Sequence, residues 1–189
     1  IRETDAVIYV LRCFDDDDIT HVANRIDPLA DFEIVETELM LADLDSLEKR
    51  RSALEKKAKG GDKDARATLA LVDAALVALR DGQPARSIAV APEDLKFWKG
   101  LQLLTQKPVL FVANVDEASA ASGNAYSKAV ESSAQKEGAA FVSISARIES
   151  EIAPLDDAEQ KEFLEAIGLE EPGLNRLIRE AFRLLGLQT

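Results

Sequence analysis

Two short polar segments follow predicted strands in the second half of the chain. Asn114-Val115-Asp116-Glu117 comes after the apolar run Pro108–Ala113, and Ser145-Ala146-Arg147 closes the run Ala139–Ser145 about 30 residues later. The asparagine side chain can bond the N7 edge of a purine and tie neighbouring loops together, while the Ser-Ala backbone amides can face the six-position of the base. The order and spacing of the two segments therefore predict purine recognition.

Each segment also has a simpler interpretation. Asn-x-x-Glu ends many strands as a turn or a helix cap, and Ser-Ala alone carries even less information. What favours the base site is that both segments follow successive buried strands, because ligands of parallel sheets bind beyond the carboxyl ends of the strands.

The elements that would position these segments follow from hydrophobic periodicity. The apolar, β-branched run Ala6–Phe14 is typical of a strand buried on both faces of a parallel sheet. Pro108–Ala113 predicts a second buried strand, and Ala139–Ser145 predicts a third strand. Helices are expected at Glu93–Thr105, Tyr126–Glu137, Ala158–Ile167 and Gly173–Leu185, the acidic stretch Glu149–Asp157 leading into the third. This alternation predicts an α/β fold with a doubly wound parallel sheet.

A helical insert interrupts the α/β pattern. Apolar residues recur at spacings of three and four on both sides of Gly60-Gly61, Arg51 fills one position, and Asp62 suits an N-cap. The repeating positions are Met40, Leu44, Leu47, Leu54 and Ala58, then Ala65, Leu69, Val72, Leu76 and Leu79. The pattern predicts an antiparallel α-helical coiled-coil hairpin, about 30 Å or more in length.

Charge is distributed unevenly along the chain. The net charge of −12 works against broad adhesion to nucleic acid or to anionic membranes. Between Glu48 and Arg66, however, eight basic residues face four acidic ones, a local excess of +4. This tip is either a solvated helix end with i,i+4 ion pairs or a basic finger for RNA phosphates or a ribosomal surface. The candidate contacts are Lys49, Arg50, Arg51, Lys56, Lys57, Lys59, Lys63 and Arg66. Base-specific readout is not expected, because the tip carries no aromatic residue.

Other chemically suggestive residues favour structural roles. Cys13 is the only cysteine, so an intrachain disulfide is excluded and a buried apolar role is expected. His21 beside Asp15–Asp18 suits a solvated turn better than a metal site, so no metal site is predicted. Phe97 and Trp98 are expected in a helix that packs on the sheet. The longest clean apolar run is far shorter than the roughly 20 residues of a membrane helix, and we expect a cytoplasmic protein.

At the level of motifs, the chain resembles the YchF or Obg-like ATPase family of Obg-type P-loop GTPases, whose bacterial members are called EngD. The matching text is IRETDAVIYVLRCFDDDDITHV, ETELMLADLDSLEKR, KKAKGGDKDA, KPVLFVANVDE and GLEEPGLNRLIREAFRLLGLQT, nearly the whole chain. The resemblance implies half of a P-loop NTPase fold and an ATP- or GTP-binding hydrolase, with ribosome association.

Carried onto this sequence, the resemblance assigns base recognition to Asn114, Val115, Glu117, Ser145 and Ala146. Common GTPases have Lys second and Asp fourth in the first motif, where the Asp accepts two bonds from guanine N1 and N2. Val115 and Glu117 stand at those places. The resemblance therefore favours ATP over GTP, with backbone groups at Val115 reading the adenine.

The phosphate-binding motifs of the family are missing from this sequence. It contains neither G-x-x-x-x-G-K-[S/T] nor Asp-x-x-Gly. We expect the glycine-rich loop and the Mg²⁺ ligands to lie upstream of Ile1. No residue is therefore assigned as catalytic, and this chain alone is expected to bind nucleotide weakly and not to hydrolyse it.

The resemblance also implies a division of the chain. Residues 1–27 and 87–189 would belong to the nucleotide-binding domain, ending at the start of a TGS domain, with the helical insert at 28–86. The strand Ala6–Phe14 would pair with the missing P-loop strand, so self-association through this edge or the coiled coil is expected. The alternative is a noncatalytic coiled-coil interaction module on an α/β scaffold, which a parent protein without a P-loop would favour.

Overall fold

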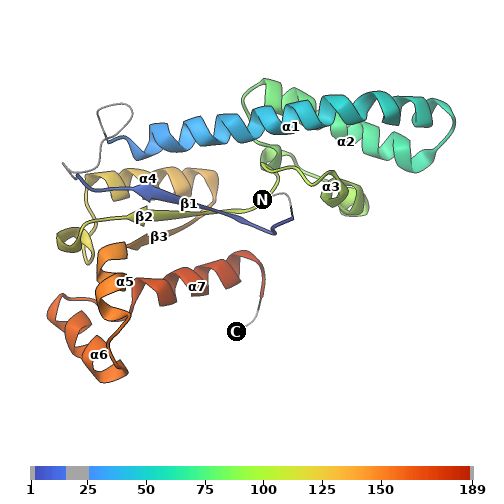
Figure 1. The fold of residues 1–189 in the computed structure, drawn as a ribbon. Coiled ribbons are helices and arrows are strands. Elements are labelled where there is room, and N and C mark those ends of the chain that lie inside the picture. Colours follow the sequence, from blue (N-terminus) through green and yellow to red (C-terminus); the bar gives the residue numbers. More distant parts are fainter. Residues whose placement is uncertain (1–2, 16–25, 188–189) are drawn as a thin grey trace. The chain divides into compact units, whose positions relative to one another are not determined.

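The computed structural model describes residues 3–15 and 26–187 of the chain (Figure 1). The chain divides into two compact units, which we treat separately. The helical unit comprises Ile1–Asp5 and Glu33–Lys107, and the sheet unit comprises Ala6–Phe32 and Pro108–Thr189. The division predicted at residues 27 and 86 stays a prediction. No helix in the described ranges is long and apolar enough to cross a membrane.

A parallel three-stranded sheet organises the sheet unit. Its strands are β1 (Val7–Arg12), β2 (Val109–Asn114) and β3 (Ala140–Ile144), in the order β1-β2-β3. Both pairings are parallel, with Arg12 opposite Asn114 and Asn114 opposite Ile144. The predicted parallel sheet is thereby confirmed, and the carboxyl ends of all three strands lie at one edge.

The core of the sheet unit lies on both faces of β2. On one face, Leu110 and Val112 pack with Leu177 and Ala181 of α7 (Gly173–Leu184). On the other face, Phe111 contacts the rings of Tyr9 and Phe32, with ring centroids 5.8 and 4.8 Å away. Helix α4 (Ala125–Glu137) contacts β2 and β3.

The prediction that the first strand is buried on both faces is wrong. Tyr9 and Leu11 are buried, but Ile8 is 45% and Val10 65% exposed. The reason is that β1 is an edge strand, and α7 packs on β2 and β3. One face of β1 is therefore apolar and open.

Two further helices follow β3. α5 (Ala146–Ile152) begins directly after the strand and occupies part of the acidic stretch expected only to lead into a helix, and α6 (Asp157–Ala166) follows it. Ile148 and Ile152 are buried against Leu164, which supplies the apolar contact that stabilises so short a helix.

The start of α7 is held by a carboxylate of α5. Glu149 accepts hydrogen bonds from the amides of Gly173 (2.7 Å) and Leu174 (3.2 Å). The negative charge is favourable there because the N-terminus of a helix carries a partial positive charge. A Cβ at Gly173 would lie 2.8 Å from Ile144 Cγ2 and 2.9 Å from Glu149 Oε1. Glycine at this position therefore permits the close approach of α7 to β3.

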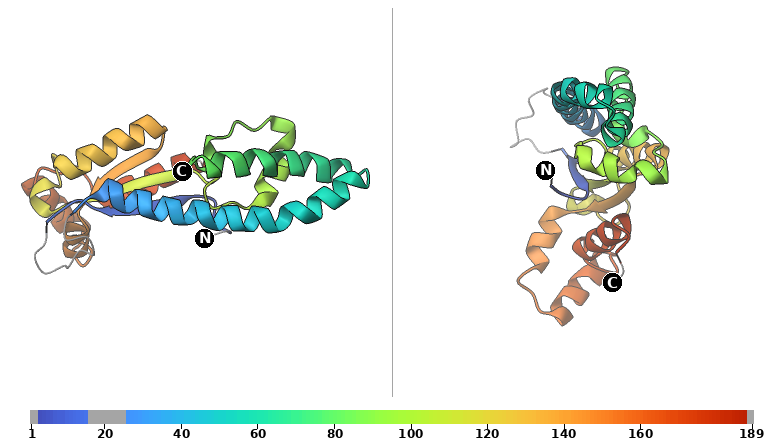
Figure 2. Two further views of the ribbon diagram at one scale, coloured as in Figure 1. Left: turned by 90° about the horizontal axis from the view of Figure 1, so that it is seen from above. Right: turned by 90° about the vertical axis from the view of Figure 1, so that its right-hand side faces the viewer.

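The helical unit is built on the predicted hairpin. α1 (Pro28–Lys59) begins at the first residue of the expected insert, and α2 (Lys63–Arg80) returns antiparallel beside it (Figure 2). Gly61 takes a φ of +93° at the turn, and Asp62 caps α2 by accepting from the Ala65 amide at 3.0 Å. Arg51, the polar residue in the apolar series, bonds Asp73 of α2 at 2.7 Å.

Trp98 packs in this hairpin rather than on the sheet, contrary to prediction. It lies on α3 (Leu95–Leu101) and is buried in a cluster with Leu47, Val72 and Leu76. α3 is shorter than the predicted Glu93–Thr105. It follows the 3₁₀ turn η2 (Pro92–Asp94), and it ends where Gln102 adopts a left-handed φ of 51°.

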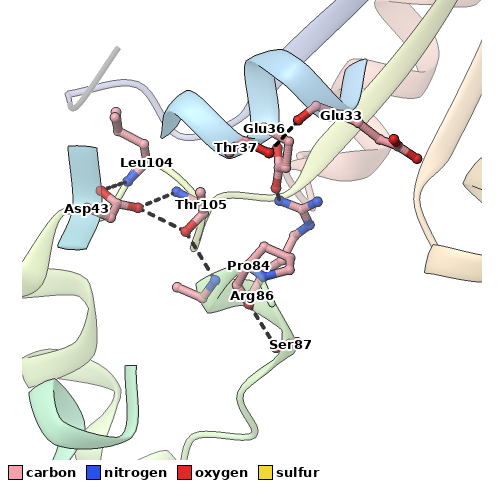
Figure 3. Close-up of polar contacts among 10 residues, drawn as sticks. Glu33, Glu36, Thr37, Asp43, Pro84, Arg86, Ser87, Leu104 and Thr105 are labelled. Carbon is pink, nitrogen blue, oxygen red and sulfur yellow. Dashed lines mark hydrogen bonds and ion pairs between the residues drawn. The ribbon is translucent and has the colours of Figure 1, made fainter. Parts of the chain in front are cut away.

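A buried carboxylate fixes the segment that follows α3 (Figure 3). Asp43 of α1 is fully buried and accepts from the Leu104 amide (2.9 Å), the Thr105 amide (2.8 Å) and the Thr105 hydroxyl (2.9 Å). The same hydroxyl oxygen accepts from the amide of Ala85, at the start of η1 (Ala85–Ser87), at 3.1 Å. The Thr105 side chain therefore links three separate stretches of the helical unit: α1, η1 and the segment after α3.

Replacing this carboxylate should destabilise the helical unit. We expect Asp43→Ala to lower the free energy of unfolding by about 2–4 kcal/mol, because two buried amides lose their acceptor. Urea unfolding followed by the fluorescence of Trp98, the only tryptophan, measures this change. The control is Asp45→Ala on the same helix, whose exposed ion pair with Lys49 should contribute less than about 1 kcal/mol. Equal effects of the two substitutions would contradict the role of Asp43.

Candidate functional site

A hollow of about 530 Å³ lies at the carboxyl edge of the sheet. Each strand contributes the residues that follow it, so three loops distant in sequence form one site. The lining residues are Phe14 and Asp15 after β1, Asn114, Val115, Asp116 and Glu117 after β2, and Ala146 and Arg147 after β3. This is the edge at which parallel sheets bind ligands.

Backbone and side-chain bonds from the end of β2 tie these loops together. Asn114 Oδ1 accepts from the Ala146 amide at 3.0 Å, and the Asn114 carbonyl accepts from the Cys13 amide at 2.8 Å. The Val115 amide donates to the Ile144 carbonyl at 2.8 Å. The Ala146 amide, expected to face the base, is thus engaged within the protein. Within residues 3–15 and 26–187 the Nδ2 group of Asn114 makes no hydrogen bond, so it could donate to a ligand.

Val115 and Glu117 present different groups to the hollow. Val115 lines the hollow but is only 2% exposed as a whole residue, so it presents little surface to a ligand. Glu117 forms an ion pair with Arg147 at 2.8 Å, and Arg147 also lies 3.5 Å from Glu151. Both partners are exposed, so the pair adds little stability, but it holds the Glu117 carboxylate toward the guanidinium.

The acidic lining of the hollow is compatible with the base and sugar of a nucleotide but not with its phosphates. Asp15, Asp116 and Glu117 outnumber Arg147 among the lining residues. Such a surface repels phosphate, because like charges in a partly enclosed site disfavour binding. The arrangement is therefore compatible with a base and a sugar, with the phosphates directed elsewhere.

Ser145, the fifth predicted base-recognition residue, does not line this hollow. It is buried at the N-cap position of α5, yet its side chain makes no capping bond. Its Oγ has no hydrogen-bond partner within the described part of the chain. The structure therefore brings Asn114, Val115, Glu117 and Ala146 together around the hollow, whereas Ser145 is not part of its lining.

Asn124 was not predicted as a site residue, and it stabilises the segment after β1. Its Nδ2 donates to the Cys13 carbonyl at 2.6 Å, and its Oδ1 accepts from the Ser127 amide at 3.0 Å, which caps α4. The sequence signal was a capping box, Asn-x-x-Ser at the start of a helix. Nearby, the Tyr126 hydroxyl lies 3.4 Å from Asp15, whose charge raises the pKa of this tyrosine.

The predicted solvated turn lies mostly outside the described residues, including Asp16–Asp18 and His21. Within residues 3–15 and 26–187, no group of three or more His, Cys, Asp and Glu side chains is placed to hold a metal ion. The preference for a solvated turn over a metal site stays a prediction.

The basic residues of the hairpin tip fall into two classes. Lys49, Arg51 and Lys59 are neutralised by Asp45, Asp73 and Glu55 at 2.6, 2.7 and 2.9 Å. Arg50 donates to the Leu101 carbonyl at 2.8 Å instead of to a carboxylate. In the region that the structure covers, no ion pair is found for Lys56, Lys57, Lys63 or Arg66. The helical i,i+4 interpretation thus accounts for only part of the tip.

Comparison with known proteins decides the family. Ribosome-binding ATPases YchF match the whole chain, at 50% identity for Pasteurella multocida, 45% for Escherichia coli O157:H7 and 43% for Bacillus subtilis. The chain belongs to the YchF family. It spans about half the length of these curated relatives, 52% in each case. No family model matches the sequence.

A solved structure confirms the fold. The YchF GTPase of Schizosaccharomyces pombe superposes with a TM-score of 0.85 at 24% identity, over 97% of this chain and 51% of that one. The family resemblance drawn from the motifs and the predicted half of a P-loop NTPase fold are both confirmed.

Cys13 provides a probe of this edge of the sheet. It is fully buried, and burial raises the pKa of its thiol to about 12. We expect the native protein to react with a thiol reagent at pH 8 at least about a hundredfold more slowly than urea-unfolded protein. Asn124→Ala should speed the reaction, because the Cys13 carbonyl loses its partner. Ser122→Ala is the control, and equal rates in native and unfolded protein would contradict the burial.

The same thiol makes stability depend on alkaline pH. The unfolded thiol loses its proton above about pH 9, while the folded one keeps it to about pH 12. The free energy of unfolding should therefore fall as pH rises through this window, and Cys13→Ala should remove that part of the decline.

Proposed function

We propose that this chain carries the base-recognition part of a nucleotide hydrolase of the YchF type, which binds and hydrolyses ATP in preference to GTP. The observation that supports the proposal is the meeting of Asn114, Val115, Glu117 and Ala146 around one hollow at the carboxyl edge of the sheet. Both relatives are named as nucleotide hydrolases, but the curated proteins are called ATPases and the solved structure a GTPase, so the names support hydrolysis and not the choice of base.

The preference for adenine rests on which groups are available. Guanine offers N1–H and N2–H, which a carboxylate accepts best, but Glu117 is engaged by Arg147. Adenine offers an N6 donor and an N1 acceptor. Because the Val115 amide is bonded to the Ile144 carbonyl, we assign their partners to the backbone that follows Val115. A mismatch of buried polar groups typically costs several kcal/mol, which is enough to separate two purines.

Phosphate binding and hydrolysis belong to other residues in this proposal. The hollow is acidic, and the sequence has no glycine-rich phosphate loop. Mg²⁺ would enter with the phosphates, since it is usually held by a few protein oxygens together with phosphate oxygens. We assign hydrolysis to a longer protein that contains this chain.

Ribosome association is the second part of the proposal. The curated relatives are named for ribosome binding, and the hairpin tip presents Lys56, Lys57, Lys63 and Arg66 without acidic partners in the described part of the chain. Such residues can contact RNA phosphates, and the affinity should fall as salt rises. A ribosome-associated hydrolase would act in the cytoplasm.

Nucleotide titration by calorimetry tests the first part. The protein, extended upstream through its P-loop, should bind ATP at least about tenfold more tightly than GTP. Asn114→Ala should weaken both nucleotides, and Val115→Lys with Glu117→Asp should shift the preference toward GTP. Glu162→Ala, exposed on α6, is the control. Tighter GTP binding would contradict the adenine argument, and binding of neither nucleotide would favour the interaction-module alternative.

We also propose that this chain self-associates through the sheet unit. The edge strand β1 exposes Ile8 and Val10, and α7 exposes Ile178 and Phe182. A second copy would cover this apolar surface.

Light scattering of concentrated protein measures this association. We expect a dimer or larger species, shifted toward monomer by Val10→Lys and unchanged by Lys161→Glu on α6. A monodisperse monomer at high concentration would contradict the proposal.

A further inference from the structure

A second hollow, of about 400 Å³, lies wholly within the helical unit. Helices α1, α2 and α3 each contribute to it. The lining residues are Arg50, Ala53, Leu54, Lys57, Thr68, Lys96, Phe97, Gly100 and Leu101. Three of these are cations and none is a carboxylate, although the whole chain carries a net charge of −12. The hollow therefore favours an anionic ligand.

The rest of the lining is apolar and includes an aromatic ring. Leu54, Phe97 and Leu101 form most of this surface, and Phe97 is only partly buried. On α3 it is the neighbouring Trp98 that packs into the core. Phe97 is thus not required to fill the core, contrary to the role predicted for it, and its ring is available at the surface of the hollow.

The cations are placed where an anion could reach them. Arg50 donates one bond to the Leu101 carbonyl at 2.8 Å, which holds its guanidinium beside the hollow while other N–H groups stay available. Lys57 has no ion pair within residues 3–15 and 26–187. The Lys96 ammonium lies 4.4 Å from the centroid of the Phe97 ring.

We propose that this hollow binds a nucleotide unit of single-stranded RNA, with its phosphate on Arg50, Lys57 and Lys96 and its base against Phe97 and Leu54. Cations beside an aromatic ring are the combination by which proteins bind unpaired strands, since every base has a face that can stack. Lys96 moves from the ring to the phosphate as the base takes its place. The inference rests on the proposed ribosome association and names the site that serves it.

The size of the hollow favours single-stranded over duplex nucleic acid. A volume of about 400 Å³ is that of a site for a single small ligand unit, and the bases of a duplex, stacked and paired, cannot enter it. An acidic peptide would satisfy the cations but would leave the aromatic and aliphatic surface without a flat partner. Single-stranded RNA satisfies both parts.

Fluorescence anisotropy with a labelled oligouridine tests the inference on the full chain. We expect Lys96→Gln and Phe97→Leu each to weaken binding about fivefold or more, since stacking contributes substantially per base. Phe97→Leu keeps an apolar side chain, which protects the fold. Lys96→Gln should also reduce the salt dependence by about one phosphate contact. The matched control is Lys99→Gln, exposed on the same helix and outside the hollow.

Three results would overturn the inference: no binding of oligouridine by the wild-type chain, equal affinities of Phe97→Leu and Lys99→Gln, or equal binding of a duplex RNA. Co-sedimentation of the extended protein with ribosomes separates the two proposals. If the extended protein sediments with ribosomes while Phe97→Leu leaves oligouridine binding unchanged, the proposed RNA site in the hollow is wrong and ribosome association stands. If Phe97 is needed for oligouridine but nothing sediments, ribosome association fails and the RNA site stands.

Discussion

Parallel pairing of β2 with a strand on each side is the constraint on which the base site depends. Because the three strands run in the same direction, the residues after Arg12, Asn114 and Ile144 emerge at one edge. The chain must therefore return across the sheet before each strand, and α4 makes one of these returns. A shift of one residue in register would move the side chains of β2 to the wrong face. The complete burial of Leu110, Phe111 and Val112 opposes such a shift.

The loops at this edge are held by polar bonds rather than by packing. Asn114 bonds Ala146, Asn124 bonds the Cys13 carbonyl, and Glu149 fixes the start of α7. The first two bonds each join a segment near the end of one strand to a segment near the end of another, and the third joins α5 to α7. Together they form the hollow before any ligand is present, so less ordering is needed on binding. At this edge the Ser145 hydroxyl has no hydrogen-bond partner among the described residues.

Their charged lining residues distinguish the hollow at the carboxyl edge of the sheet from the hollow in the helical unit. The one in the sheet unit has three carboxylates and a guanidinium, whereas the one in the helical unit has three cations and no carboxylate. The net charge of −12 describes neither of them. Ion pairs also divide the hairpin tip, because Lys49, Arg51 and Lys59 are neutralised while Lys57 has no acidic partner in the part of the chain that the structure describes. The potential that a ligand meets therefore depends on pairing, not on composition.

The sequence by itself determined the strands, the hairpin with its Gly60-Gly61 turn, and the place of Asn114 and Glu117 after the second strand, because periodicity, turns and caps are local properties. It did not reveal that Ile8 and Val10 are exposed, since an apolar run looks the same at an edge and in the middle of a sheet. It also placed Trp98 on the wrong partner and missed the engagement of Glu117 by Arg147. Phe97 meets Arg50 and Lys57 only in the folded helical unit. Such contacts join residues far apart in the chain, so only tertiary structure decides them.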